Sequence, residues 1–76
     1  MKNMDFKLRQ GEEFIKLGQL LKAAGLCSNG ADAKYDIVNG RVKVNDSVEL
    51  QRGRKIKEGD IIEYDGKKLT VRKKDM

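Results

Sequence analysis

The chain has 76 residues, enough for one small domain spanning residues 1–76 with a compact core. Hydrophobic residues make up 38% of the chain and charged residues another 38%. Because the apolar residues come in clusters, this balance fits a globular protein with a densely charged surface rather than a disordered chain. Seventeen lysines and arginines outweigh twelve acidic residues, giving a net charge of +5. Such an excess attracts polyanions, most often nucleic acid, and otherwise an acidic protein or an anionic membrane.

The positive charge is concentrated in the second half of the chain. Residues 1–38 hold six basic and five acidic side chains, and residues 39–76 hold eleven and seven. Residues 41–57 alone have six basic and two acidic side chains. Three of the six are arginines: Arg41, Arg52 and Arg54. Because guanidinium groups suit phosphates, the three arginines make a binding surface about as good an interpretation as a solvated charged face.

Several classes of function lack the residues they need. The chain has no histidine and one cysteine, Cys27, which leaves no catalytic triad, internal disulfide or multi-cysteine zinc site. Its glycines are scattered singly, so there is no phosphate loop of the Walker or dinucleotide type. No stretch approaches the roughly 20 apolar residues of a membrane span, and no signal-peptide core is visible. We therefore predict a cytoplasmic protein that is not an enzyme and has no cofactor, metal or membrane partner.

The first predicted elements are a strand and a helix. Phe6 and Leu8 alternate with charged residues, which is a strand pattern. Residues 14–17 suit the end of a strand or the start of a helix equally well. Beyond them, the spacing of leucines predicts a helix over residues 17–24, which Gly25 ends.

A second helix is predicted over residues 30–39. Ser28 or Asn29 can cap it by accepting a backbone N–H, and Asn39-Gly40 stops it. Because only a few residues join the two helices, they must pack as a helical hairpin.

After the second helix the hydrophobic period changes to two. Alternating residues predict strands over 41–45, 48–50, 61–64 and 69–71. The first two form a hairpin, and Asp65-Gly66 is a strong turn signal between the last two. Residues 52–57 are predicted to form a basic loop. A strand, two helices and four strands indicate an α+β domain.

Nucleic-acid binding is the function that this pattern favours. Arg41, Lys43 and Asn45 face away from the valines of their strand and form a polar row. Lys34 and the basic loop are expected to border the same surface. The start of the second helix adds backbone N–H groups and a positive dipole end, which suit a phosphate. The candidate contacts are Ser28, Asn29, Gly30, Lys34, Arg41, Lys43, Asn45, Arg52, Arg54 and Lys55.

Few aromatic residues are available to stack on bases. Phe6 and Phe14 are expected in the core, and Tyr35 and Tyr64 in the core or at its rim, so a single-strand stacking platform is disfavoured. Recognition of backbone and shape in folded or double-stranded RNA is favoured instead. DNA is disfavoured because the second helix lacks base-reading side chains. A protein-interaction adaptor that docks an acidic partner on the same face is the alternative.

A set of short segments between residues 17 and 60 completes the pattern. They are Leu17-Gly18-Gln19-Leu20-Leu21-Lys22, Ala24-Gly25, Ser28-Asn29-Gly30, Ala33-Lys34, Asn39-Gly40-Arg41-Val42-Lys43-Val44-Asn45 and Glu58-Gly59-Asp60. This core resembles the RNA-binding domain named after ribosomal protein S4, also called the alpha-L motif. Glu49 and Arg52-Gly53-Arg54-Lys55 resemble its small stand-alone bacterial subgroup of YaaA type.

The resemblance implies a two-helix hairpin on a small curved, mostly antiparallel sheet that binds ribosomal or transfer RNA. The contacts it implies are Lys34, Arg41, Lys43, Asn45, Arg52 and Arg54. Many members carry Ser-Arg at the start of the second helix, where this chain has Asn29-Gly30, so contact there is expected through the backbone. Catalytic members have a fused enzyme domain, and we expect no such domain here. We expect a monomer that binds structured RNA. Ribosomal or transfer RNA is the expected ligand, and the ribosome is a possible partner.

Overall fold

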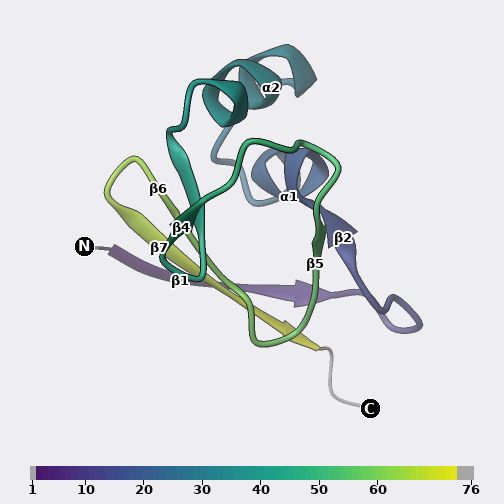
Figure 1. Cartoon of the computed structure of the whole chain (residues 1–76). Coiled ribbons are helices and arrows are strands. Elements are labelled where there is room, and N and C mark those ends of the chain that lie inside the picture. The colour runs from purple at the N-terminus through teal and green to yellow at the C-terminus, as the bar shows by residue number, and fades with distance from the viewer. Residues whose placement is uncertain (1, 74–76) are drawn as a thin grey trace.

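The computed structural model describes residues 2–73. Two helices, α1 (Leu17–Ala23) and α2 (Gly30–Val38), pack on one side of a five-stranded sheet of order β1-β7-β6-β3-β4 (Figure 1). The strands are β1 (Lys2–Leu8), β2 (Ile15–Lys16), β3 (Val42–Val44), β4 (Ser47–Val48), β5 (Lys55–Ile56), β6 (Ile61–Tyr64) and β7 (Lys67–Lys73). No helix in this part of the chain is long and apolar enough to cross a membrane.

The five-stranded sheet is antiparallel except at one pair. β1 runs parallel to β7 over its whole length, from Lys2 opposite Lys67 to Leu8 opposite Lys73. The pairs β6–β7, β3–β6 and β3–β4 are antiparallel. The predicted α+β class, with a helical hairpin on a mostly antiparallel sheet, is confirmed.

The core lies between the helices and one face of the sheet. Leucines of α1 at the predicted spacing are fully buried, as are the β3 valines that alternate with Lys43. The buried apolar residues are Leu8, Leu17, Leu20, Leu21, Cys27, Ala33, Ile37, Val42, Val44, Ile56, Ile62, Leu69 and Val71. Because successive strand residues point to opposite faces, the polar residues between them lie on the other side of the sheet. We call this solvent-facing side the open face.

Both helices form where the sequence predicts them, each ending one residue earlier. Asn29 caps α2 through its Oδ1, which accepts the N–H of Asp32 at 2.9 Å. Gly25 and Gly40 follow the two helices with φ of +76° and +75°, the left-handed conformation that ends a helix most easily with glycine.

The hairpin after α2 is shorter than predicted. Asn45 and Asp46 make its turn with φ of 51° and 69°, the positive pair that a tight two-residue turn requires. β4 therefore begins at Ser47 and ends at Val48. Val48 and Leu50 are 52% and 55% exposed, so neither adds to the core.

The region predicted as a basic loop contains a strand, and that part of the prediction is wrong. Within residues 52–57, β5 pairs with β2, with Ile56 opposite Ile15. The side chain of Ile56 is fully buried. A ladder of two residues has no periodicity that a sequence can display, which is why the strand was missed.

Phe14 is not in the core, so that expectation is wrong as well. The preceding residues form a turn and β2 starts at Ile15, which packs against the core while its neighbour Phe14 points outward. The Phe14 side chain is 38% exposed. Phe6, in contrast, does pack against the core.

Candidate nucleic-acid interface

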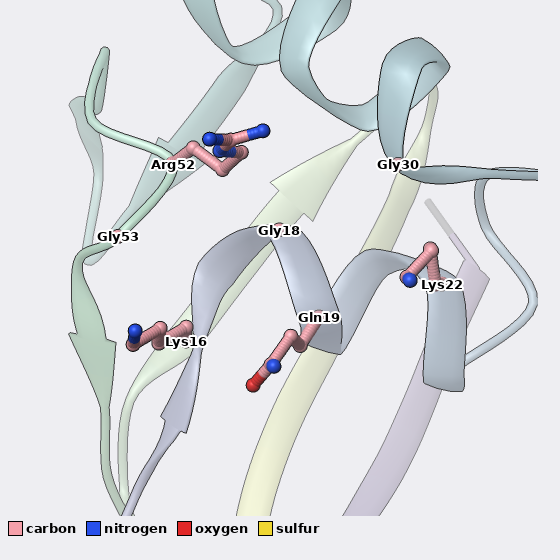
Figure 2. Close-up of a pocket in the computed structure, with 7 residues that line it drawn as sticks. All are labelled: Lys16, Gly18, Gln19, Lys22, Gly30, Arg52 and Gly53. Carbon is pink, nitrogen blue, oxygen red and sulfur yellow. The ribbon is translucent and has the colours of Figure 1, made fainter.

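An open groove runs beside α1 and the loop that precedes β5. It has a volume of about 380 Å3, and we call it the basic groove. Its lining residues come from β2, α1, the first residue of α2 and the loop: Lys16, Gly18, Gln19, Lys22, Gly30, Arg52 and Gly53 (Figure 2). Among the described residues that line it, three are cationic and none is acidic. This combination suits a polyanion.

The walls of the basic groove are hydrogen-bonded to each other. The N–H of Leu17 donates to the carbonyl of Arg54 at 2.9 Å, and the N–H of Gly18 donates to the carbonyl of Arg52 at 3.0 Å. These N–H groups open α1 and have no acceptor within the helix. The loop satisfies them and is thereby fixed against the helix.

Gly18 gives Arg52 a place to lie. A Cβ at position 18 would stand 2.6 Å from Cγ of Arg52, closer than such atoms approach, and 3.2 Å from its Cδ. Figure 2 shows the Arg52 side chain extending from the loop in the direction of Gly30. The absence of a side chain on α1 therefore allows the guanidinium to sit over the groove.

Glu49 holds the loop that carries Arg52. Its Oε1 accepts from Nη1 of Arg54 at 2.7 Å, and its Oε2 accepts from the N–H of Gln51 at 3.1 Å. The hydrogen bond from Arg54 lowers the pKa of Glu49 below its ordinary value, although partial burial acts in the opposite direction. The guanidinium of Arg54, a predicted RNA contact, is thus paired with Glu49.

The start of α2 borders the basic groove through Gly30. A side chain added there would meet nothing within 4 Å, so the backbone is open to a ligand. The unpaired N–H groups of a first helical turn and the positive end of the helix dipole favour an anion. Ser28 and Asn29 are exposed beside it, and Asp32 in the first turn adds an opposing charge.

The predicted polar row is divided in the structure. Lys43 lies on the open face, away from the helices and the groove, with Glu63 opposite it in β6. Nδ2 of Asn45 donates to Oδ1 of Asp60 at 3.1 Å, and its Oδ1 accepts the N–H of Ile61 at 3.0 Å. Asn45 therefore fastens its turn to the start of β6.

The remaining predicted contacts also lie outside the basic groove. Nη1 of Arg41 is 3.9 Å from Oδ1 of Asp36, and its guanidinium lies 6.0 Å from the centre of the Tyr35 ring. Lys34 is exposed on α2, and Nζ of Lys55 lies 5.0 Å from the centre of the Phe14 ring. Of the ten predicted residues, the structure brings Gly30 and Arg52 into the groove.

A separate polar cluster ties α2 to the sheet. The hydroxyl of Tyr64 donates to Oδ2 of Asp36, and Sγ of Cys27 donates to that hydroxyl at 3.7 Å. The hydrogen bond with Asp36 raises the pKa of Tyr64 well above its ordinary value. These groups satisfy one another, and residues 2–73 contain no group of three or more cysteine and acidic side chains placed to hold a metal ion.

Five groove residues were not among the predicted contacts: two glycines, Gly18 and Gly53, and three polar residues, Lys16, Gln19 and Lys22. Lys16, Gln19 and Lys22 belong to the half of the chain whose net charge is only +1, so charge counting passed over them. The spacing does carry a signal, because Gln19 and Lys22 lie on the side of α1 away from its buried leucines, and Lys16 directly precedes that helix.

Comparison with known proteins identifies close relatives. A family model described as S4 domain matches residues 6–72. RlbA of Bacillus subtilis strain 168, described as a probable ribosome maturation protein, is 43% identical over 54 residues, which are 71% of this chain and 76% of that protein. A tyrosine–tRNA ligase of Ralstonia nicotianae is 36% identical over 58 residues, but these are only 15% of that enzyme.

A solved structure has the same arrangement of helices and strands. The solution structure of YbcJ from Escherichia coli superposes with a TM-score of 0.68 at 36% identity, covering 95% of this chain and 91% of that one. It is described as containing an alpha-L motif involved in RNA binding. The fold and the family expected from the sequence are both confirmed.

Proposed function

Because this chain belongs to the S4 domain family, we propose that it binds structured RNA through the basic groove and catalyses no reaction itself. The observation that carries the proposal is the set of groove cations, Lys16, Lys22 and Arg52, on walls without an acidic residue among those described. Lysine and arginine beside open backbone N–H groups are the usual ligands of an RNA backbone. The hydrogen bonds that fix the loop to α1 hold the Arg52 backbone against the helix before RNA arrives.

We propose ribosomal RNA, free or in a ribosomal particle, as the target. The relative RlbA, described as a probable ribosome maturation protein, supports this choice. The basic groove offers cations and backbone groups, with Gln19 as its single uncharged polar side chain, so it suits recognition of shape and backbone rather than of base edges. The protein would then act as a monomer in the cytoplasm.

Two variants with the same change in net charge test the assignment. Lys22→Glu with Arg52→Glu reverses two groove cations, and Lys43→Glu with Lys68→Glu reverses two cations of the open face. Fluorescence anisotropy would measure their affinity for a ribosomal RNA fragment, a transfer RNA and a duplex DNA at two salt concentrations. Thermal unfolding would confirm that both variants remain folded.

We expect the groove variant to lose affinity for folded RNA by a factor of about 30 or more, since phosphate contacts dominate such binding. The open-face variant should change it by about threefold at most, through long-range charge alone. Equal losses in the two variants would mean that net charge acts generically and would overturn the groove assignment. Equal affinity for RNA and DNA would contradict RNA recognition.

A further inference from the structure

A second groove continues from the basic groove along the other side of Lys16 and Gln19, which line both. Its volume is about 370 Å3. Four apolar side chains contribute to its walls: Phe6, Phe14, Ile15 and Ala23. We call it the aromatic groove.

The two grooves differ in the charge of their walls. The aromatic groove is lined by two cations, Arg9 and Lys16, and by the carboxylate of Glu12, whose Oε1 accepts the N–H of Arg9 at 2.8 Å. The basic groove has three cations and no acidic residue among its described lining. A carboxylate repels phosphate, so an RNA backbone is favoured in the basic groove over this one. Apolar and aromatic walls with polar groups at their border suit a planar base instead.

Phe14 is the part of the aromatic groove best placed to meet such a base. Its side chain is 38% exposed although it is large and apolar. Nζ of Lys55 lies 5.0 Å from its ring centre, so a cation already borders the ring. An aromatic ring beside a cationic track is the combination that binds unpaired nucleotides.

We propose that Phe14 stacks against an unpaired base of the RNA whose backbone occupies the basic groove. This inference rests on the proposed function and adds to it a preferred ligand: structured RNA flanked by an unpaired nucleotide. Continuity through Lys16 and Gln19 supports it, because one nucleotide can place its phosphate in the first groove and its base in the second.

The test compares two RNAs that share one hairpin. The first hairpin ends blunt, and the second carries a short unpaired extension with 2-aminopurine, whose fluorescence is quenched by stacking. Phe14→Leu removes the ring but keeps an apolar side chain, and Phe14→Tyr keeps the ring. Thermal unfolding of each variant measures any structural effect separately.

For Phe14→Leu we expect about tenfold weaker binding of the extended RNA, unchanged binding of the blunt RNA, and loss of the quenching that wild type and Phe14→Tyr produce. Wild-type affinity and quenching in Phe14→Leu would overturn the proposal. Equal weakening on both RNAs would also overturn it, since it would make Phe14 a structural residue. Arg52→Glu keeps the two hypotheses apart: it should weaken binding of both RNAs, and its failure to do so would contradict the proposed function instead.

Discussion

The basic groove and the open face of the sheet both carry lysines and arginines, but the two regions differ in what surrounds these cations. In residues 2–73, no acidic side chain lies within ion-pair distance of Lys16, Lys22 or Arg52. On the open face, Nε of Arg72 lies 3.4 Å from Oδ1 of Asp5. Register there also places Glu63 between Lys43 and Lys68.

This difference teaches that the position of acidic residues, more than the number of basic ones, decides which surface presents unneutralised positive charge. Cross-strand pairs of opposite charge stabilise a solvated sheet and neutralise one another. Unpaired cations around a concave surface add their fields instead. The densest basic segment of the sequence, residues 41–57, is therefore spread over several surfaces, and Arg52 is its one cation in the groove.

The largest expected effect comes from neutralising the groove. If Lys16, Lys22 and Arg52 each contact a phosphate as proposed, changing them to glutamine should lower the slope of log affinity against log salt by about 2 to 3. Affinity near 0.1 M salt should drop by a factor of about 100. A salt titration measures both quantities. The matched change of Lys7, Lys43 and Lys68 on the open face should leave the slope within about 0.5 of the wild type, and a comparable fall there would remove the distinction between the two surfaces.

A smaller effect is expected from Gly18→Ala. The new Cβ would displace the Arg52 side chain, so RNA affinity should fall about tenfold, while the helix itself gains from alanine by up to about 1 kcal/mol. The decisive measurement is a double-mutant cycle, in which Gly18→Ala should cost nothing once Arg52 is alanine. Gly53→Ala is the control, because a Cβ there meets nothing within 4 Å. Additive losses would show that Gly18 acts independently of Arg52.

Glu49→Gln should act on stability and on binding together. Loss of the charged hydrogen bond with Arg54 should lower the free energy of unfolding by about 1 kcal/mol and weaken RNA binding about twofold to threefold. The pKa of folded Glu49 lies below its ordinary value of 4.5. The ionised carboxylate therefore contributes fully to the free energy of unfolding at pH values above 4.5. This contribution is lost as the pH falls through the lowered value. Urea unfolding over a series of pH values should therefore separate the variant from wild type at pH 7, and the difference should shrink as the pH is lowered below 4.5.

The smallest expected effect tests whether acidic residues keep the open face from binding. Asp5→Asn with Glu63→Gln leaves the cations of that face without their neighbours, which should raise affinity for any RNA about twofold at low salt and not at moderate salt. Filter binding at two salt concentrations can detect this change. A decrease in affinity would mean that these carboxylates support the RNA-binding surface indirectly.

Much of the fold could be predicted from the sequence because its signals are local. The leucine spacing of α1, the Asn29 cap and the valine alternation of β3 each depend on neighbouring residues. The β2–β5 ladder could not be predicted in this way, because the two residues of β2 pair with two residues of β5 that lie some forty positions later in the chain. The parallel pairing of β1 with β7 likewise leaves no local trace.

The site was predicted less completely, for a related reason. Charge density along the chain pointed to Arg52, which lines the basic groove, and also to Lys43, which the pleat turns to the open face. Lys16 and Lys22 reach the groove because the loop folds over the start of α1, a contact made by backbone hydrogen bonds that any sequence can form. Their individual contributions to RNA binding remain predictions.

The parallel pair at the edge of the sheet has a consequence for how the chain folds as it is made. β1 is synthesised first among the described strands, yet its hydrogen-bonding neighbour β7 is synthesised last, with Lys2 and Lys67 at matching positions. Until β7 is made, β1 has no neighbouring strand, and its apolar residues Met4, Phe6 and Leu8 cannot complete their packing in the core. The helical hairpin and the β3–β4 turn involve nearby residues and can form earlier. Completion of the domain therefore awaits the final strand, and a nascent chain stalled before residue 67 would present an unpaired β1 to chaperones and to other chains.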